Sequence, residues 1–131
     1  MPVSYALEGA LLRLDLVDQY EPGDIIQQFL AGLADPDCPE KVALLLDTTR
    51  SASLEKRSPQ EIRRVAVFLE PYIGRIGGRC AVVARSDVHF GMSRMGSAHS
   101  AEVGVNAQIF RDPEAALAWL GVRPRLQGGA T

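Results

Sequence analysis

The stretch that decides the fold is VALLLDTTRS, residues 42–51. Its first half, Val42–Leu46, is continuously apolar, which is typical of a strand that is covered on both faces. Cys80–Ala84 is a second run of this kind, and Asn106–Phe110 is predicted to form a third, shorter strand. Because helical segments separate these strands, we expect a single, mainly parallel sheet with helices packed on its faces. The sequence therefore predicts an α/β fold.

The chain is expected to open with a β-hairpin. Ser4–Leu7 and Ala10–Leu16 are two apolar-rich runs with Gly9 between them, and a glycine in this position indicates a tight turn. In the second run, leucines alternate with Arg13 and Asp15, which is the period-two pattern of a half-buried strand. The hairpin should add one antiparallel strand to the sheet.

Four helices are predicted from capping residues and from apolar residues at helical spacing. The second has the strongest signals, because Ser58-Pro59-Gln60-Glu61 is a capping box and Gly77-Gly78 supplies a left-handed stop. Two glycines weaken the third helix by roughly 1 kcal/mol each relative to alanine. The predicted helices span residues 22–34, 58–76, 86–101 and 113–120. The expected order of elements is β-β-α-β-α-β-α-β-α.

Length and composition fit one domain. The chain has 131 residues, of which 47% are hydrophobic, enough for one substantial core. We assign residues 1–122 to this domain and residues 123–131, where the apolar pattern is lost, to a flexible C-terminal tail. A net charge of −2 argues against a dedicated nucleic-acid binder.

Localisation follows from what the sequence lacks. No apolar run approaches the roughly 20 residues that a membrane-spanning helix needs, and the N-terminus has no signal-peptide pattern. Cys38 and Cys80 form no metal-like spacing, and a reducing compartment fits them better than a disulfide. We therefore expect a cytoplasmic protein.

Polar residues follow each predicted inner strand. Asp47, Thr49 and Arg50 begin a predicted polar loop at residues 47–57, and Arg85 follows the next strand. In a parallel sheet these positions lie along one edge, where open α/β sheets bind ligands. Arginines and hydroxyl groups there suit an anion such as a phosphate or carboxylate. The alternative is that these residues cap helices and pair with nearby acids.

The hydroxyl-rich loop contains two serines that could accept a phosphoryl group, Ser51 and Ser53. Arg50 or Arg85 could form an ion pair with the added negative charge. The alternative is an ordinary solvated loop.

A second candidate surface lies on the predicted third helix. Phe90, Met92 and Met95, together with Arg94, combine adaptable apolar side chains with a positive charge. They could line a pocket or a dimer contact, or could simply pack in the core.

Catalytic chemistry has little support in the sequence. There is no Gly-x-Ser-x-Gly elbow, and His89 and His99 lie on roughly opposite faces of the predicted third helix. We assign no catalytic residue, no metal ligand and no cofactor.

Two segments carry a resemblance to a known family: FGMSRM at residues 90–95 and FRDPEAALAWL at residues 110–120. With the order of elements, they make the chain resemble the SpoIIAA-like, STAS-type domains over roughly residues 4–121. The resemblance implies a non-catalytic module that docks a partner or a small ligand. Sigma-regulating members are switched by phosphorylation of a serine just after a central strand, where this chain has DTTRS at residues 47–51.

The leading hypothesis is a STAS-like binding or regulatory module that docks a protein partner or ligand at the carboxyl edge of the sheet. The first alternative is a carrier for a small acidic or apolar ligand, and the second is a small hydrolase or transferase. Homodimerisation through an edge strand or through the glycine-containing third helix is also open.

Overall fold

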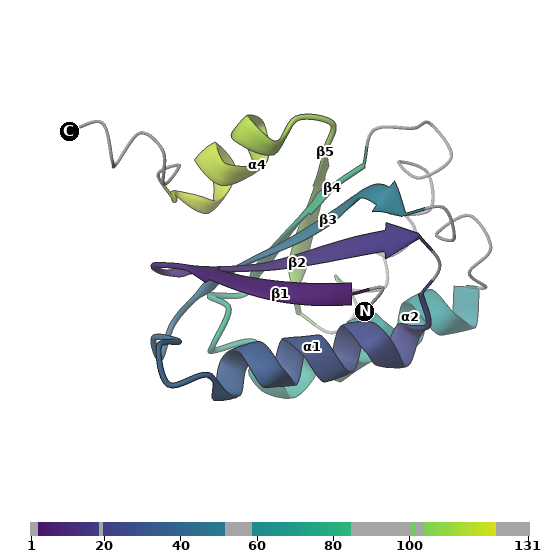
Figure 1. Cartoon of the computed structure of the whole chain (residues 1–131), viewed down its shortest axis with the longest axis horizontal. Coiled ribbons are helices and arrows are strands. Elements are labelled where there is room, and N and C mark those ends of the chain that lie inside the picture. Colours follow the sequence, from purple (N-terminus) through teal and green to yellow (C-terminus); the bar gives the residue numbers. More distant parts are fainter. Residues whose placement is uncertain (1–2, 19, 52–58, 85–100, 102–103, 123–131) are drawn as a thin grey trace.

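The computed structural model describes residues 3–18, 20–51, 59–84, 101 and 104–122. In this part of the chain the fold is the expected single mixed sheet with helices on both faces (Figure 1). The strands are β1 (Val3–Glu8), β2 (Leu11–Asp18), β3 (Ala43–Ser51), β4 (Arg79–Val83) and β5 (Asn106–Phe110). The helices are α1 (Pro22–Ala34), α2 (Pro59–Phe68) and α4 (Pro113–Leu120), with a short 3-10 helix at Glu70–Tyr72.

The five strands lie in chain order, β1-β2-β3-β4-β5. β1 and β2 are antiparallel and form the predicted hairpin, and every later neighbouring pair is parallel. Glu8 pairs with Leu11, so the turn has two residues, and its first residue, Gly9, has a φ of 64°. Glycine adopts this conformation without strain, which explains the sharp return of the chain.

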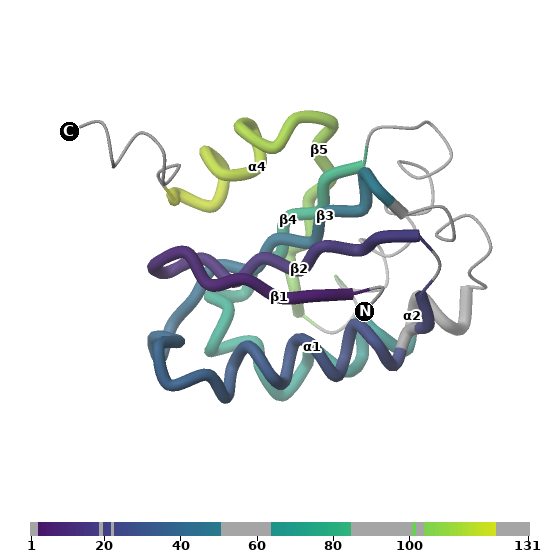
Figure 2. Tube along the Cα trace, in the orientation of Figure 1, coloured from purple at the N-terminus to yellow at the C-terminus, as the bar shows by residue number. Residues whose placement is uncertain are grey.

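α1 and α2 cover one face of the sheet, and α4 lies on the other (Figures 1 and 2). The leucines of β2 at positions 12, 14 and 16 are buried beneath α1 and α2 in the larger of two apolar clusters. Phe29 of α1 forms edge-to-face contacts with Phe68 and Tyr72, with ring centroids 5.8 and 5.4 Å apart. This face is therefore closed by apolar packing.

α4 closes only part of the opposite face. It packs on β4 and β5, where Ala116 and Leu120 join the smaller apolar cluster. Arg79 of β4 holds the end of this helix, because its Nη1 donates to the Trp119 carbonyl at 2.8 Å and its guanidinium lies 5.1 Å from the centre of the Trp119 ring. Leu11 at the start of β2 is still buried in the smaller cluster, but Ser4 and Ala6 of β1 are exposed on the same face, so the face is open along β1 within the described part of the chain.

The last helix begins and ends as predicted. The Asp112 side chain accepts a hydrogen bond from the Glu114 amide, and Gly121 is left-handed with a φ of 77°. Gly77 and Gly78 have positive φ values, of 64° and 73°, but they do not end a helix as predicted, because turns occupy residues 73–78.

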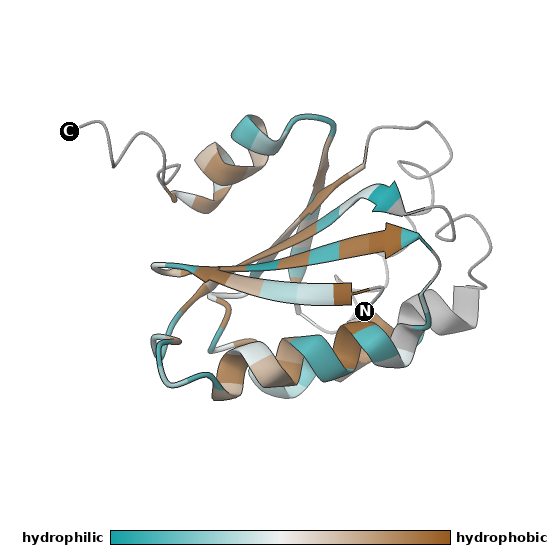
Figure 3. Cartoon of the chain, viewed as in Figure 1, coloured by the Kyte–Doolittle hydropathy of each residue, from teal (hydrophilic) through white to brown (hydrophobic). Residues whose placement is uncertain are grey.

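Two predicted boundaries are wrong. The residues after Leu46 do not form a loop, because β3 continues to Ser51; Figure 3 shows this strand turning from hydrophobic to hydrophilic toward its carboxyl end. The second helix does not reach residue 76. It ends at Phe68, because Pro71 has no amide hydrogen to donate and disfavours helical geometry in Glu70.

Other predictions lie outside the described residues. These are the third helix at residues 86–100, the Ser58 cap and the tail at residues 123–131.

Candidate functional site

The strand register brings charged residues of β2 and β3 together. Asp15 lies opposite Asp47 in the parallel pair, and Arg13 lies opposite Leu45. Since side chains alternate between faces, Arg13, Asp15 and Asp47 share the face that carries α4, away from α1 and α2. They lie on the part of that face next to the exposed residues of β1.

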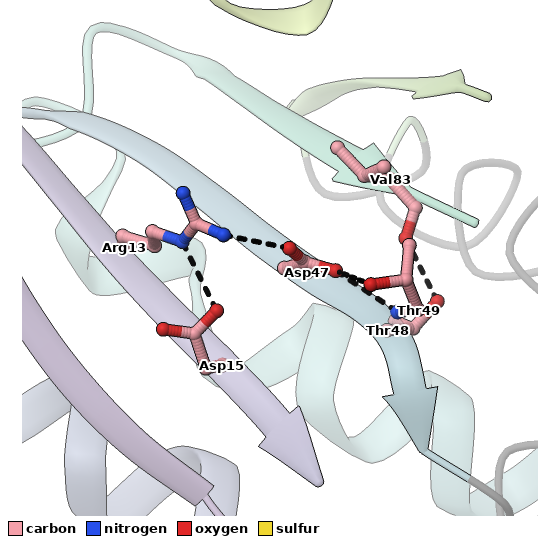
Figure 4. A network of polar contacts seen from close by, with 6 residues as sticks. All are labelled: Arg13, Asp15, Asp47, Thr48, Thr49 and Val83. Atoms are coloured by element: carbon pink, nitrogen blue, oxygen red, sulfur yellow. Dashed lines mark hydrogen bonds and ion pairs between the residues drawn. The ribbon is translucent and has the colours of Figure 1, made fainter. Parts of the chain in front are cut away.

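A single arginine joins the two carboxylates (Figure 4). Arg13 Nε donates to Asp15 Oδ1 at 3.0 Å, and Arg13 Nη2 donates to Asp47 Oδ2 at 2.8 Å. The three side chains differ in exposure: 32% for Arg13, 19% for Asp15 and 9% for Asp47. The most buried charge is therefore neutralised by a guanidinium that still reaches solvent.

Two threonines fix the β3 side of this arrangement. The Thr49 amide and hydroxyl both donate to Asp47 Oδ1, at 2.9 and 2.6 Å. The buried Thr48 hydroxyl donates to the Val83 carbonyl of β4 at 2.8 Å (Figure 4). We call Arg13, Asp15, Asp47, Thr48 and Thr49 the polar network.

A β-bulge lies within the polar network. Asp15 pairs with Asp47, but Val17 pairs with Arg50, so β3 contains one more residue than β2 over this interval. Bulges of this kind shift the alternation of side chains and are frequent next to functional sites. Because of this shift, the register position of Arg50 lies on the same face of the sheet as Asp15 and not on the face that α1 covers.

The Arg13 guanidinium remains positively charged in this environment. Burial lowers the pKa of its guanidinium, but the hydrogen bond to Asp15 and the charges of Asp15, Asp47 and Glu8 outweigh this and raise the pKa above its ordinary value. Within the described residues, Arg13 Nη1 and Asp15 Oδ2 have no hydrogen-bond partner (Figure 4). The polar network thus presents one charged donor and one charged acceptor on the open part of the sheet.

The structure places only some of the residues predicted to form the site. Asp47 and Thr49 meet within the polar network, while Arg50 is an exposed residue of β3 and Ser51 is the last residue of that strand. The others lie outside the described residues: Ser53, Arg85, Phe90, Met92, Arg94 and Met95.

Sequence reasoning missed Arg13 and Asp15. Their alternation with leucines indicated a solvent-facing side of a strand, and the Asp47 partner of Arg13 is 34 residues away in the chain. The available signal was that an arginine and an aspartate two positions apart share one face of a strand.

One cavity within the described residues lies in the apolar layer between the sheet and the two helices α1 and α2. Its volume of about 10 Å³ is roughly the space that one water molecule occupies. Ligand pockets are about 300–1,000 Å³, so this cavity holds no ligand. It is lined by Leu14, Ile25, Phe29, Leu44, Leu46, Val65, Phe68 and Leu69.

Two kinds of feature are absent from the part of the chain that the structure describes. No cluster of three or more His, Cys, Asp or Glu residues there is arranged to hold a metal ion. No helix there is long and apolar enough to cross a membrane.

The chain has structural relatives but no match by sequence: no protein-family model and no curated protein matches it. Its structure is similar to the crystal structure of an uncharacterized DUF3478-family protein with a SpoIIAA-like fold from Shewanella loihica PV-4. The TM-score is 0.55 with 16% sequence identity, and the match covers 90% of this chain and 91% of the other. At this identity the likeness shows the fold alone. The predicted resemblance is confirmed at that level: this chain has a SpoIIAA-like α/β fold.

Proposed function

We propose that this protein is a non-catalytic, STAS-like binding or regulatory module that docks a protein partner over the polar network. The observation that carries the proposal is the Arg13 bridge between Asp15 and Asp47 on a part of the sheet that α4 does not cover. Taking such charges out of water is costly, and apolar residues of similar volume commonly stabilise a fold as well or better. An arrangement that stability does not require is better explained by recognition.

The chemistry of the polar network suits a protein surface. Arg13 Nη1 is a charged donor, and Asp15 Oδ2 is a charged acceptor, each without a partner among the described residues. Arg50 adds an exposed positive charge farther along β3. A partner that presents both donors and acceptors can engage all three groups, whereas a simple anion would face Asp15 and Asp47 as well.

The contact between Thr49 and Asp47 does not favour a hydrolase or transferase. A nucleophilic hydroxyl needs a neighbouring base that is available to take its proton. The Asp47 carboxylate already accepts hydrogen bonds from Arg13 and from the Thr49 amide. This supports a structural role for the short contact between the Thr49 hydroxyl and Asp47.

We place the module in the cytoplasm. Cys38 and Cys80 are both free thiols, which suits a reducing compartment.

The test is native mass spectrometry of the protein purified from its own source organism. Asp15→Asn and Arg50→Ala remove charges from the proposed surface, and Gln108→Ala, an exposed residue on β5, is the matched control. We expect a protein partner on the wild type and on the control but not on the double variant Asp15→Asn/Arg50→Ala.

Other outcomes contradict the proposal. A partner retained by the double variant excludes the polar network as the docking site. A small-molecule mass in place of a protein favours the carrier, and a chain with no added mass contradicts docking altogether.

A further inference from the structure

The face of the sheet that carries α4 has room for a second helix. On the opposite face α1 and α2 contact each other through Phe29 and Phe68, whereas on this face α4 packs mainly on β4. Two strand spacings separate β4 from β2, a distance of about 10 Å. Packed helices lie about 8–10 Å apart, so a helix over β2 would lie directly against α4. The side chains of Ser4 and Ala6 next to β2 are exposed, so the structure leaves this space open.

α4 has an exposed surface opposite to the one that packs on its own sheet. Ala116 and Leu120 face the sheet and are buried. At 3.6 residues per turn, Glu114, Ala115 and Ala118 point away from it, and all three are exposed. Glu114 is the single charge in this helix, and Figure 3 shows the rest of the helix as largely hydrophobic. A helix that is apolar around nearly its whole circumference is typical of one that is covered on both sides.

The two exposed surfaces are complementary in size and in charge. The sheet surface has the small side chains of Ser4 and Ala6, and the helix surface has two alanines, so the two surfaces can approach closely. Arg13 Nη1 is a charged donor without a partner among the described residues, and Glu114 is an exposed charged acceptor. Each copy of the chain therefore carries both halves of one contact.

A twofold axis parallel to the strands and above β3 brings these surfaces together. Because β2 and β4 flank β3, this axis carries α4 to a place over β2 of a second copy, at the same level along the strands. The ladder pairs Phe110 with Val83. It pairs Val83 in turn with Asp47, and Asp47 with Asp15. Since α4 begins three residues after Phe110, its amino end lies near the two aspartates of the second copy, whose charge the positive end of the helix dipole offsets.

We infer that α4 docks over β2 of a second copy of this chain, so that two copies form a twofold dimer with both α4 helices between the two sheets. The inference rests on the proposed function, because it names the second copy as the protein that covers the polar network. Each contact is made twice in such a dimer, and the interface closes on itself. Every α4 then has a sheet on both sides.

The first test measures the oligomeric state by sedimentation equilibrium and multi-angle light scattering. Ala115→Glu/Ala118→Glu places two charges on the outer surface of α4, where the dimer would bury them without partners. The matched control is Ala31→Glu/Ala34→Glu, which changes two exposed alanines at the same spacing on α1, on the opposite face of the sheet. We expect the wild type and the control to be dimers, and the α4 variant to dimerise at least about tenfold more weakly. Far-UV circular dichroism shows whether each variant is folded.

A charge-rescue experiment tests the contact itself. Ser4→Lys/Ala6→Lys should also weaken the dimer, because it puts two lysines beneath α4 of the second copy. Mixed with Ala115→Glu/Ala118→Glu, it should form a heterodimer that native mass spectrometry detects. In this heterodimer one contact pairs lysines with glutamates, and the other contact is unchanged.

The outcomes separate this inference from the proposed function. A wild-type monomer that still carries a different protein, lost in Asp15→Asn/Arg50→Ala, overturns the inference alone. So does a dimer that Ala115→Glu/Ala118→Glu leaves intact, a dimer that the α1 control weakens equally, or a mixture without the heterodimer. A wild type that is monomeric at millimolar concentration and carries no bound protein overturns both the inference and the proposed function.

Discussion

Arg13→Met removes the positive charge from between two carboxylates while keeping most of the aliphatic stem. Asp47, whose side chain is only 9% exposed, then loses the guanidinium nitrogen that lies 2.8 Å from Oδ2. Removing one partner costs about 3–5 kcal/mol in a buried pair and about 0.2–1 kcal/mol in an exposed one. Arg13 is 32% exposed, and Asp47 keeps two hydrogen bonds from Thr49. We therefore expect the variant to lose about 2 kcal/mol of unfolding free energy.

Asp47→Asn completes a double-mutant cycle. The asparagine oxygen can still accept the hydrogen bonds from Thr49, so this change removes mainly the charge. Once Arg13 is methionine, no guanidinium remains for Asp47 to neutralise. The double variant should therefore be little less stable than Arg13→Met alone, with a coupling energy of about 1–2 kcal/mol.

The assay is urea unfolding at pH 7, followed both by far-UV circular dichroism and by Trp119 fluorescence. Coincident transitions by the two probes justify a two-state treatment. Additivity of the two substitutions within about 0.5 kcal/mol would refute the reasoning, because residues that do not interact behave in this way.

Two further predictions concern the packing of the core. Burial raises the pKa of the Cys80 thiol to about 12, so between about pH 9 and pH 12 this thiol ionises only in the unfolded chain. The free energy of unfolding should therefore fall as the pH rises through this range. Urea unfolding of Cys80→Ala should show a smaller fall over the same range, because the variant lacks the thiol. The same pH dependence in Cys80→Ala as in the wild type would contradict this prediction. Gly32→Ala places a methyl group 2.6 Å from Leu12 Cδ1 and should lower unfolding free energy by about 1 kcal/mol, the net of crowding and helix propensity. The control is Gly23→Ala in the same helix, where an added methyl group meets nothing within 4 Å and the change should be neutral or stabilising. If the two variants shifted the thermal unfolding temperature equally, the close approach of Gly32 to Leu12 would be contradicted.

The sequence predicted an element correctly where residues within or next to that element determine its ends. β5 spans the predicted residues, Asn106–Phe110, because Ala107 and Ile109 alternate with polar residues and Arg111-Asp112 follow directly. α4 follows the Asp112 cap and ends at Gly121, since both positions act through their own backbone and side chain. The fold class follows from elements of this kind.

Local signals failed where a boundary depends on a distant strand. β3 continues through five polar residues, and one of them, Thr48, is buried because its hydroxyl bonds the Val83 carbonyl on β4. The pairing of Arg13 with Asp47 depends on the register of β2 against β3. Neither contact can be deduced from alternation within one strand. Pro71 is different, because its effect on the second helix was readable from the sequence.

The polar network also meets a physical demand that the fold itself creates. α1 and α2 close one face of the sheet. On the other face the apolar cluster beneath α4 reaches Leu45 of β3 and Leu11 at the start of β2, but not the later residues of β2, which therefore cannot be apolar on both faces without exposing apolar surface. Separate exposed charges would satisfy this demand. They would not require Arg13 to be shared by two carboxylates, one of them Asp47, which is nearly buried and held by Thr49. The sharing holds in place Arg13 Nη1 and Asp15 Oδ2, which have no partner among the residues that the structure describes, and a partner that binds preorganised groups loses less conformational entropy. This preorganisation is the reason to interpret the polar network as a recognition surface and not as a set of separately solvated charges.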